Sequence, residues 1–288
     1  MKRILTYKLF EEQETIRLAG GQVEWLNQCT EGTWELDHET GLVDVIGSFD
    51  CSYQDLTDLK GIRFGKVTAT FDCSNNQLTS LVGAPKEVGG NFYCSYNGLT
   101  SLDGAPEKVG GSFYCLGNQL TSLEGAPENV GKDFLCIGNQ LTSLAGAPEK
   151  VGGGFYCSNN QLTSLVGAPV EVGKHFICNN NQLTSLVGAP ERVGGNFDCN
   201  DNQLTSLEGA TVKVGEYFYC SENPVSDETL SAIYGIMKTG RSYPEALTEY
   251  WDQMPEEEKI LMYANNPDLS DDEKRGYELK AKVSKKVY

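Results

Sequence analysis

The ten cysteines are the residues of this 288-residue chain best suited to redox or zinc chemistry. Cys29 and Cys51 come first, and from Cys73 onward every cysteine follows the last by 21 residues, at 94, 115, 136, 157, 178, 199 and 220. Zinc sites need cysteine pairs a few residues apart that converge on the metal, and disulfides need side chains that point toward one another. A strict spacing of 21 instead puts parallel side chains in one slot of a repeated unit. We therefore predict free, buried thiols, no metal site, and Cys29 as the most independent thiol.

The other residues of catalytic type are sparse. A Ser-His-Asp triad needs a positioned histidine, and the chain has only His38, in a predicted hairpin turn, and His175, at a repeat position otherwise held by Asn, Ser, Asp or Gly. Both are interpreted as plain surface residues. Glycine runs such as residues 152–154 lack the Gly-Lys-Ser/Thr ending of a phosphate loop and recur as turns. The sequence therefore predicts a protein that is not an enzyme and uses no cofactor.

Charge restricts the class of partner. Acidic residues outnumber basic ones 40 to 23, giving a formal net charge of −17, which disfavours nucleic acids and anionic membranes. Asp198, Asn200 and Asp201 could hold a cation through oxygen atoms, but a solvated polar edge is the favoured interpretation. We expect no membrane span and no secretory signal, because Lys8 and Glu11 interrupt the early apolar stretch. The expected location is the cytoplasm, and the oligomeric state is left open.

A period of 21 residues organises the chain from residue 49 to residue 222. One unit runs from Phe92 to Ser112, and nine Phe-x-Cys segments occur in all. Because side chains alternate along a strand, Phe92 and Cys94 should face inward and Tyr93 outward. Leu99, Leu102 and Val109 should continue the core, while Gly-Ala-Pro turns the chain on the outer side.

An asparagine follows each Phe-x-Cys segment at 76, 97, 118, 139, 160, 181, 202 and 223, and Gln54 replaces it in the first unit. Its amide can donate and accept, so we predict that it satisfies backbone groups in a buried bend. Stacked units should then form a parallel sheet of nine strands.

The segments outside the repeats predict two caps. Residues 1–48 should form an N-terminal α/β cap, with a short helix over 22–28 and strands over 33–37 and 42–45. In residues 223–288 the pattern becomes helical, with capping boxes at 242–245 and 270–273. We interpret this second segment as a C-terminal helical cap or a docking segment.

The phrase Phe71-Asp72-Cys73-Ser74-Asn75-Asn76-Gln77-Leu78 resembles the L-x-L-x-x-N-x-L motif of bacterial leucine-rich repeats. The wider match, residues 33–45, 58–67 and the recurrent Leu-Thr-Ser-Leu-x-Gly-Ala-Pro, resembles leucine-rich-repeat proteins of tailed bacteriophages. The resemblance implies an α+β repeat solenoid, an arc with a parallel β-sheet on its concave face. It implies binding, without functional residues to carry over, in the cytoplasm of an infected host. A parallel β-helix is the alternative, and we favour the leucine-rich repeat because each unit shows one clear strand.

The concave face is where we expect binding. The residues between Phe and Cys, and those after Cys, are apolar in the middle units and polar at both ends. The predicted partner-binding residues are Tyr93, Tyr114, Leu116, Leu135, Ile137, Tyr156 and Ile177, flanked by Asp72 and Asp198. The alternative explanation of the same pattern is a structural ladder of good strand formers. The predicted function is a protein-binding module, and the alternative is a structural component of a phage particle.

Overall fold

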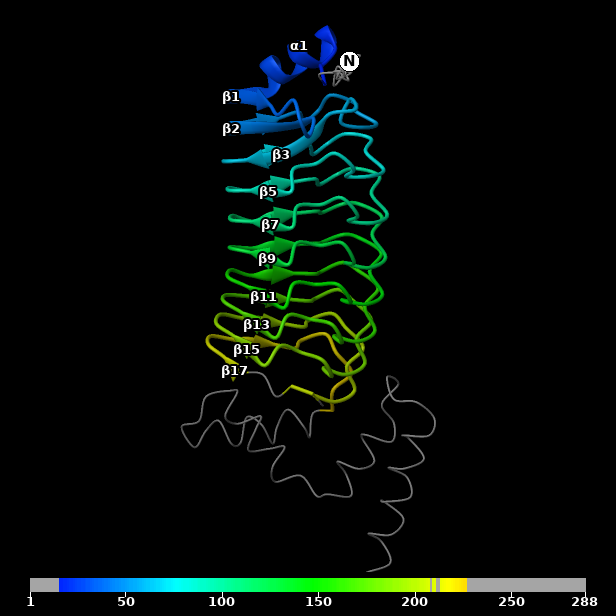
Figure 1. Cartoon of the computed structure of the whole chain (residues 1–288). Coiled ribbons are helices and arrows are strands. Elements are labelled where there is room, and N and C mark those ends of the chain that lie inside the picture. The colour runs from blue at the N-terminus through cyan, green and yellow to red at the C-terminus, as the bar shows by residue number, and fades with distance from the viewer. Residues whose placement is uncertain (1–15, 208, 211–212, 227–288) are drawn as a thin grey trace, which may run out of the picture.

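The computed structural model describes residues 16–207, 209–210 and 213–226. These residues form a parallel β-solenoid whose 21-residue coils stack into an elongated column, with helix α1 (Gly20–Cys29) at its N-terminal end (Figure 1). Each coil except the last described one contributes two strands that pair in register with the equivalent strands of its neighbours, so the described coils carry two ladders of strands.

The first ladder, called here the first sheet, contains the Phe-x strands and confirms the nine strands expected from the repeat. Its strands are parallel and pair Phe with Phe along the stack. They are β2 (Leu42–Asp50), β4 (Phe71–Asp72), β6 (Phe92–Tyr93), β8 (Phe113–Tyr114), β10 (Phe134–Leu135), β12 (Phe155–Tyr156), β14 (Phe176–Ile177), β16 (Phe197–Asp198) and β18 (Phe218–Tyr219).

The second ladder, called here the second sheet, contains the x-Val strands. It consists of β3 (Arg63–Val67), β5 (Glu87–Val88), β7 (Lys108–Val109), β9 (Asn129–Val130), β11 (Lys150–Val151), β13 (Glu171–Val172), β15 (Arg192–Val193) and β17 (Lys213–Val214). The expectation of one strand per unit is therefore wrong. A two-residue strand bounded by turns has no alternation of its own, and it exists because the neighbouring coils supply its hydrogen bonds.

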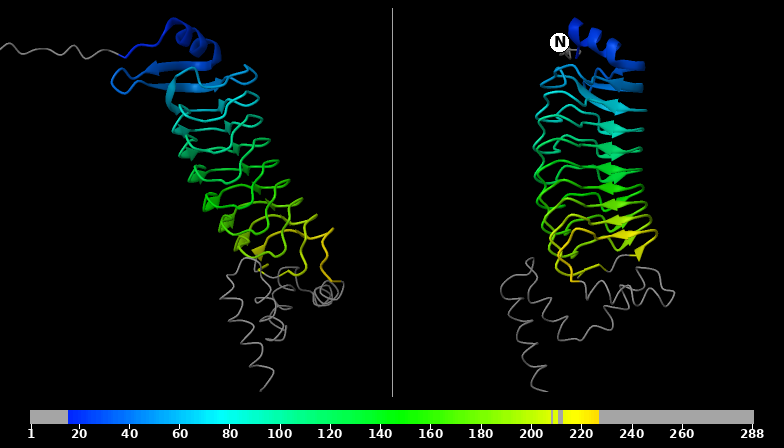
Figure 2. Two further views of the ribbon diagram at one scale, coloured as in Figure 1. Left: turned by 90° about the vertical axis from the view of Figure 1, so that its right-hand side faces the viewer. Right: turned by 180° about the vertical axis from the view of Figure 1, so that it is seen from behind.

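The second sheet also changes the expected shape. A solenoid curves into an arc when the elements on one side of each coil are wider than those on the other. Here both sides carry strands. Both sheets repeat at the same inter-strand spacing. Figures 1 and 2 accordingly show a column of near-constant width without a horseshoe curve. The face predicted to be concave is therefore the outer face of the first sheet.

The N-terminal elements agree with their predicted types. Strand β1 (Thr30–Leu36) pairs antiparallel with β2, and Asp37 and Leu42 close the hairpin. Helix α1 buries Trp25, Leu26 and Cys29, and the Trp25 ring meets Phe49 edge-on at 5.2 Å. Its function as a cap, like the three domain boundaries, stays a prediction. The helices predicted in 223–288 lie outside the described residues beyond Ser226.

The interior of the column repeats the same side chains in every coil. Phe71 to Phe218 form a continuous stack with successive ring centroids 5.0 to 5.6 Å apart. Leu99, Leu102 and Val109 are buried, as predicted, and so are their equivalents in most described coils. The outward turn is also confirmed, since Gly104 adopts a φ of 89°, which only glycine tolerates well.

The asparagine slot binds the backbone as predicted. The Nδ2 of Asn139 donates to the carbonyl oxygens of Cys115 and Cys136 at 3.1 and 3.0 Å, and its Oδ1 accepts from the Leu120 backbone N–H at 3.1 Å. One amide thus joins two coils. In the first coil Gln54 turns to α1 instead, accepting from the Trp25 indole and donating to the Cys29 sulfur.

Candidate binding face

The outward positions of the first sheet form a regular array. The residue between Phe and Cys forms what we call the central column, and parallel pairing holds its members in register from coil to coil. The column reads Asp50, Asp72, Tyr93, Tyr114, Leu135, Tyr156, Ile177, Asp198 and Tyr219. The structure therefore brings the predicted residues of this column together on one face.

The apolar stripe, defined as Tyr93, Tyr114, Leu116, Leu135, Ile137, Tyr156 and Ile177, is half-buried throughout. Tyr93 and Tyr114 stack with centroids 4.4 Å apart and 17° between their planes. Asn91 donates to the Tyr93 hydroxyl at 2.8 Å. Burial raises the pKa of the Tyr93 hydroxyl, although the Asn91 hydrogen bond opposes that rise. The phenol is thus a neutral, positioned group rather than a base.

Leu116 and Ile137 lie in a second column, that of the residue after Cys. In other coils this position holds a small side chain, and Ser74, Ser95 and Ser158 are buried there. Leucine and isoleucine are larger and remain half-buried, so they widen the apolar surface beside the central column in the middle coils.

Sequence reasoning identified the repeat position before Phe through His175, but it missed that this position forms a third column of hydrogen-bonding residues. Its members Asn91, Asp133 and His175 each accept a hydrogen bond from a backbone N–H of the next coil, at 2.8 to 3.0 Å. The alternation rule would have found it, because this residue and the one after Phe point to the same side. His175 is therefore better described as a coil-to-coil connector than as a plain surface residue.

In this third column the residue before Phe155 is Gly154, and the Tyr156 side chain lies where a side chain of residue 154 would be. A Cβ built on Gly154 would lie 2.6 to 2.7 Å from atoms of the Tyr156 ring, so the phenol occupies the space that a side chain would take. Burial, followed by the neighbouring Asp133, raises the pKa of Tyr156. The ring of Tyr156 therefore packs over the backbone of Gly154.

The two aspartates at the ends of the stripe each accept a hydrogen bond from the backbone N–H two residues further along the chain. The Oδ1 of Asp72 accepts from the Ser74 N–H at 2.8 Å, and the Oδ1 of Asp198 accepts from the Asn200 N–H at 3.0 Å. Burial raises the pKa of Asp198, with Asp201 adding to the rise. Within the described residues, no group of three or more His, Cys, Asp or Glu side chains is arranged to hold a metal ion.

The repeat cysteines pack inside the solenoid, as predicted. The described cysteines are free, and all but Cys220 are buried. Each thiol from Cys73 to Cys199 donates a weak hydrogen bond to a carbonyl oxygen of the next coil, at 3.2 to 3.6 Å. Burial raises the thiol pKa well above its usual value, as at Cys94 and Cys136, which disfavours the thiolate that nucleophilic attack or metal ligation needs.

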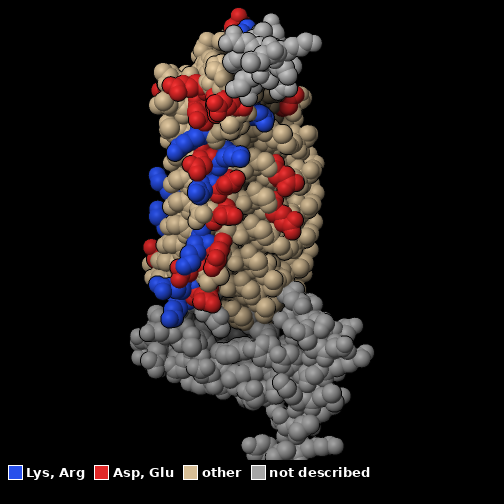
Figure 3. Space-filling model, in the orientation of Figure 1, with Lys and Arg blue, Asp and Glu red and all other residues tan. Residues whose placement is uncertain are grey.

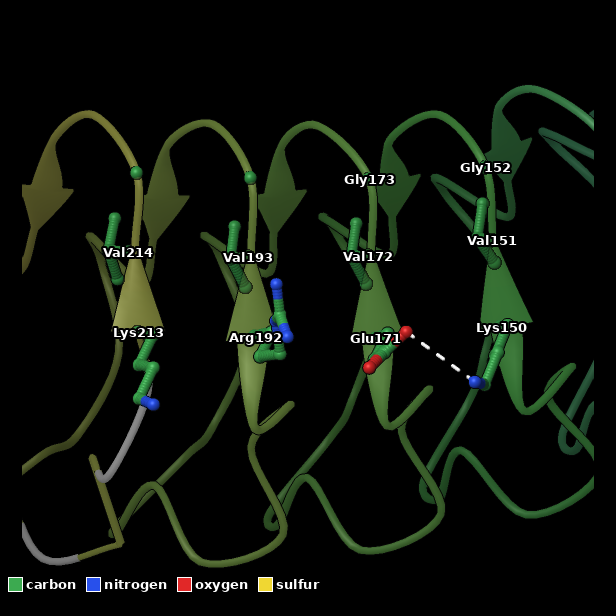
Figure 4. Close-up of a pocket in the computed structure, with 12 residues that line it drawn as sticks. Lys150, Val151, Gly152, Glu171, Val172, Gly173, Arg192, Val193, Lys213 and Val214 are labelled. Atoms are coloured by element: carbon green, nitrogen blue, oxygen red, sulfur yellow. Dashed lines mark ion pairs between the residues drawn. The ribbon is translucent and has the colours of Figure 1, made fainter.

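The outer face of the second sheet carries charge instead. Glu87 lies 3.6 Å from Lys66 and 3.8 Å from Lys108, and Lys150 pairs with Glu171 at 3.5 Å. Figure 3 shows the resulting band of mixed charge. A shallow groove of about 570 Å³ follows the strands from Lys150 to Gly215 (Figure 4). Its rim is solvated, and its charges are of both signs.

This geometry defines a repeat-solenoid protein with a chemically distinct outer face on its first sheet. No protein-family model matches the chain, and no curated protein matches it in sequence. Among solved structures it is similar to YopM from Yersinia enterocolitica WA-314, at 19% identity and a TM-score of 0.39, over 66% of this chain. The chain spans about half, 53%, of that protein's chain. These values are too low to assign a family, so the leucine-rich-repeat resemblance stays a prediction from the motif.

Among the described residues, no helix combines the length and the apolar character that a membrane span requires.

Proposed function

We propose that the protein is a non-enzymatic binding module whose first sheet presents the apolar stripe to a protein partner. The observation that carries the proposal is the in-register run Tyr93, Tyr114, Leu135, Tyr156 and Ile177 on an outward face. A contiguous apolar surface is favourable to cover, and tyrosine is common among residues that dominate binding energies.

Rigidity supports the same proposal. Tyr93 is fixed by Asn91 and by stacking on Tyr114, and Tyr156 is fixed against Gly154. Side chains that are already ordered lose little conformational entropy on binding, so more of the contact energy appears as affinity.

A proposal about the origin of the chain rests only on residues 33–45, residues 58–67 and the recurrent Leu-Thr-Ser-Leu-x-Gly-Ala-Pro. On these we propose a bacteriophage protein that acts on a host target or a defence system. A structural or assembly component of a phage particle is the alternative, since the same face could join copies or neighbours in a particle.

The test is affinity purification from a bacterial host lysate followed by mass spectrometry. The double variant Tyr114→Asp/Tyr156→Asp should lose the partner, because it puts two charges into the apolar contact. Val82→Asp/Val166→Asp is the matched control, since these side chains are 74% and 53% exposed outside the stripe. Circular dichroism should show that both variants fold.

A partner retained by wild type and by the stripe variant would contradict the proposed site. If neither the wild type nor the Tyr114→Asp/Tyr156→Asp variant captures a protein, a structural role in a phage particle is favoured. Sedimentation of the pure protein, and a search for it in purified particles, then test that alternative.

A further inference from the structure

The outer face of the first sheet has no lysine or arginine at its outward positions. Each coil has four such positions, two of which contain the stripe: the residue before Phe, the one after it, and the two after Cys. From Ser48 to Glu222 none of these is Lys or Arg, whereas Asp50, Asp72, Asp133, Asp198, Asp201 and Glu222 are acidic. The second sheet differs, since its outward column contains Lys66, Lys108, Lys150, Arg192 and Lys213.

The acids are not spread evenly over this face. Asp50 and Asp72 lie in the coils before the stripe, and Asp198 and Asp201 in the coil after it, so most of the negative charge is at the two ends of an apolar centre. Asp72 and Asp198 are six rungs apart, or about 29 Å at the usual strand spacing.

These carboxylates are oriented with one oxygen available. In Asp50, Asp72 and Asp198 the Oδ1 accepts the local hydrogen bonds, from Ser52, Ser74 and Asn200 respectively. Among the described residues, Oδ2 of each accepts no hydrogen bond. A fixed carboxylate with an open oxygen suits a lysine or arginine of a partner.

We propose that the first sheet binds a polypeptide segment whose apolar residues are flanked on both sides by Lys or Arg. The apolar centre would cover the stripe, and the basic flanks would meet Asp72 at one end and Asp198 at the other. An extended segment needs about nine residues to span this distance, at 3.3 Å per residue. The inference rests on the proposed function and specifies the chemistry of the partner.

The experiment uses the full chain and two synthetic peptides, each with the same nine-residue centre of alternating Leu and Ser. One peptide has two lysines at each end and the other two glutamates. Fluorescence anisotropy should give a dissociation constant about tenfold lower for the lysine peptide at low salt, and the difference should shrink at high salt.

Two double variants separate the site from the overall charge of the protein. Asp72→Asn/Asp198→Asn keeps the Oδ1 acceptors and should remove most of the preference. Glu107→Gln/Glu128→Gln makes the same change in net charge on exposed residues outside the face, and it should leave the preference in place.

Equal weakening by both double variants would overturn the proposal, because net charge alone would then explain it. Equal binding of the two peptides, or binding of neither, would overturn it as well. A protein captured through Tyr114 and Tyr156 but indifferent to Asp72→Asn/Asp198→Asn would leave the proposed function standing and refute only the basic flanks.

Discussion

The two sheets of the solenoid share one backbone period of 21 residues but differ in the side chains of their inner and outer faces. Inside, the first sheet stacks Phe and Cys and the second stacks Val, almost without variation. Outside, the second sheet carries charged side chains joined by three ion pairs whose members are 44% to 64% exposed, and such pairs stabilise little. The first sheet carries tyrosine, leucine and isoleucine between aspartates.

The difference separates folding from recognition. A solenoid is stable because each coil buries the face of the next, so inward positions must repeat. Outward positions have no such requirement, and mixed charge, as on the second sheet, is sufficient for solubility. The apolar side chains of the first sheet depart from that pattern, which solubility does not require and which recognition of a partner would explain.

The largest effect we expect comes from alkaline pH, which should act mainly on the interior of the first sheet. Burial raises the pKa of all eight thiols from Cys51 to Cys199. In the unfolded chain thiols ionise above a pH of about 8.5. The unfolded state then binds fewer protons than the folded state, so stability falls as pH rises. The loss is about 1.4 kcal/mol per pH unit for each thiol.

Urea denaturation at increasing pH measures this dependence. Cys115→Ala should flatten it by one thiol, whereas Val151→Ala in the second sheet should lower stability without changing the pH dependence. A midpoint that stays constant well above pH 9 would show that the thiols ionise as easily in the folded column as in the unfolded chain.

The next effect concerns the asparagine slot that follows the first sheet. Asn139→Ala should cost roughly 1–3 kcal/mol, because buried carbonyl and N–H groups of two coils lose their partner. Asn97→Ala, nearer the end of the column and half-buried, should cost less in global stability if units add as nearest neighbours. Denaturant melts measure both, and exposed Gln140→Ala is the control with almost no loss. Equal, negligible losses at both asparagines would contradict the bridging role.

The smallest effect is expected on the second sheet. Removing one ion pair with Lys150→Ala or Glu171→Ala should change stability by about 0.5 kcal/mol or less, because both side chains are solvated. Thermal melts at low and high salt provide the measurement. A loss comparable to that of Asn139→Ala would mean that the charged column holds the coils together, and the contrast between the two sheets would disappear.

Much of the fold could be predicted from the spacing alone. A residue type that returns every 21 positions must occupy one structural slot, so the inward Phe and Cys, the bridging Asn139 and the register of Tyr93 with Tyr114 all followed from the repeat. The second strand of each coil did not, because Lys108–Val109 is too short to show a pattern and depends on hydrogen bonds from its neighbours. For that reason the expectation of one strand per unit, which favoured an arc over a β-helix, is wrong.

The candidate face divides in the same way. The sequence by itself determined which side chains share an outward column and that they are apolar between two aspartates, because alternation and period are properties of the chain. Only the tertiary structure decided how those side chains are held: Tyr93 by Asn91, Tyr156 in the space above Gly154, and His175 by the Asn196 backbone. The first two contacts join residues two apart in one coil, and the third joins two coils. All three depend on where packing places the side-chain atoms, which the sequence spacing does not specify.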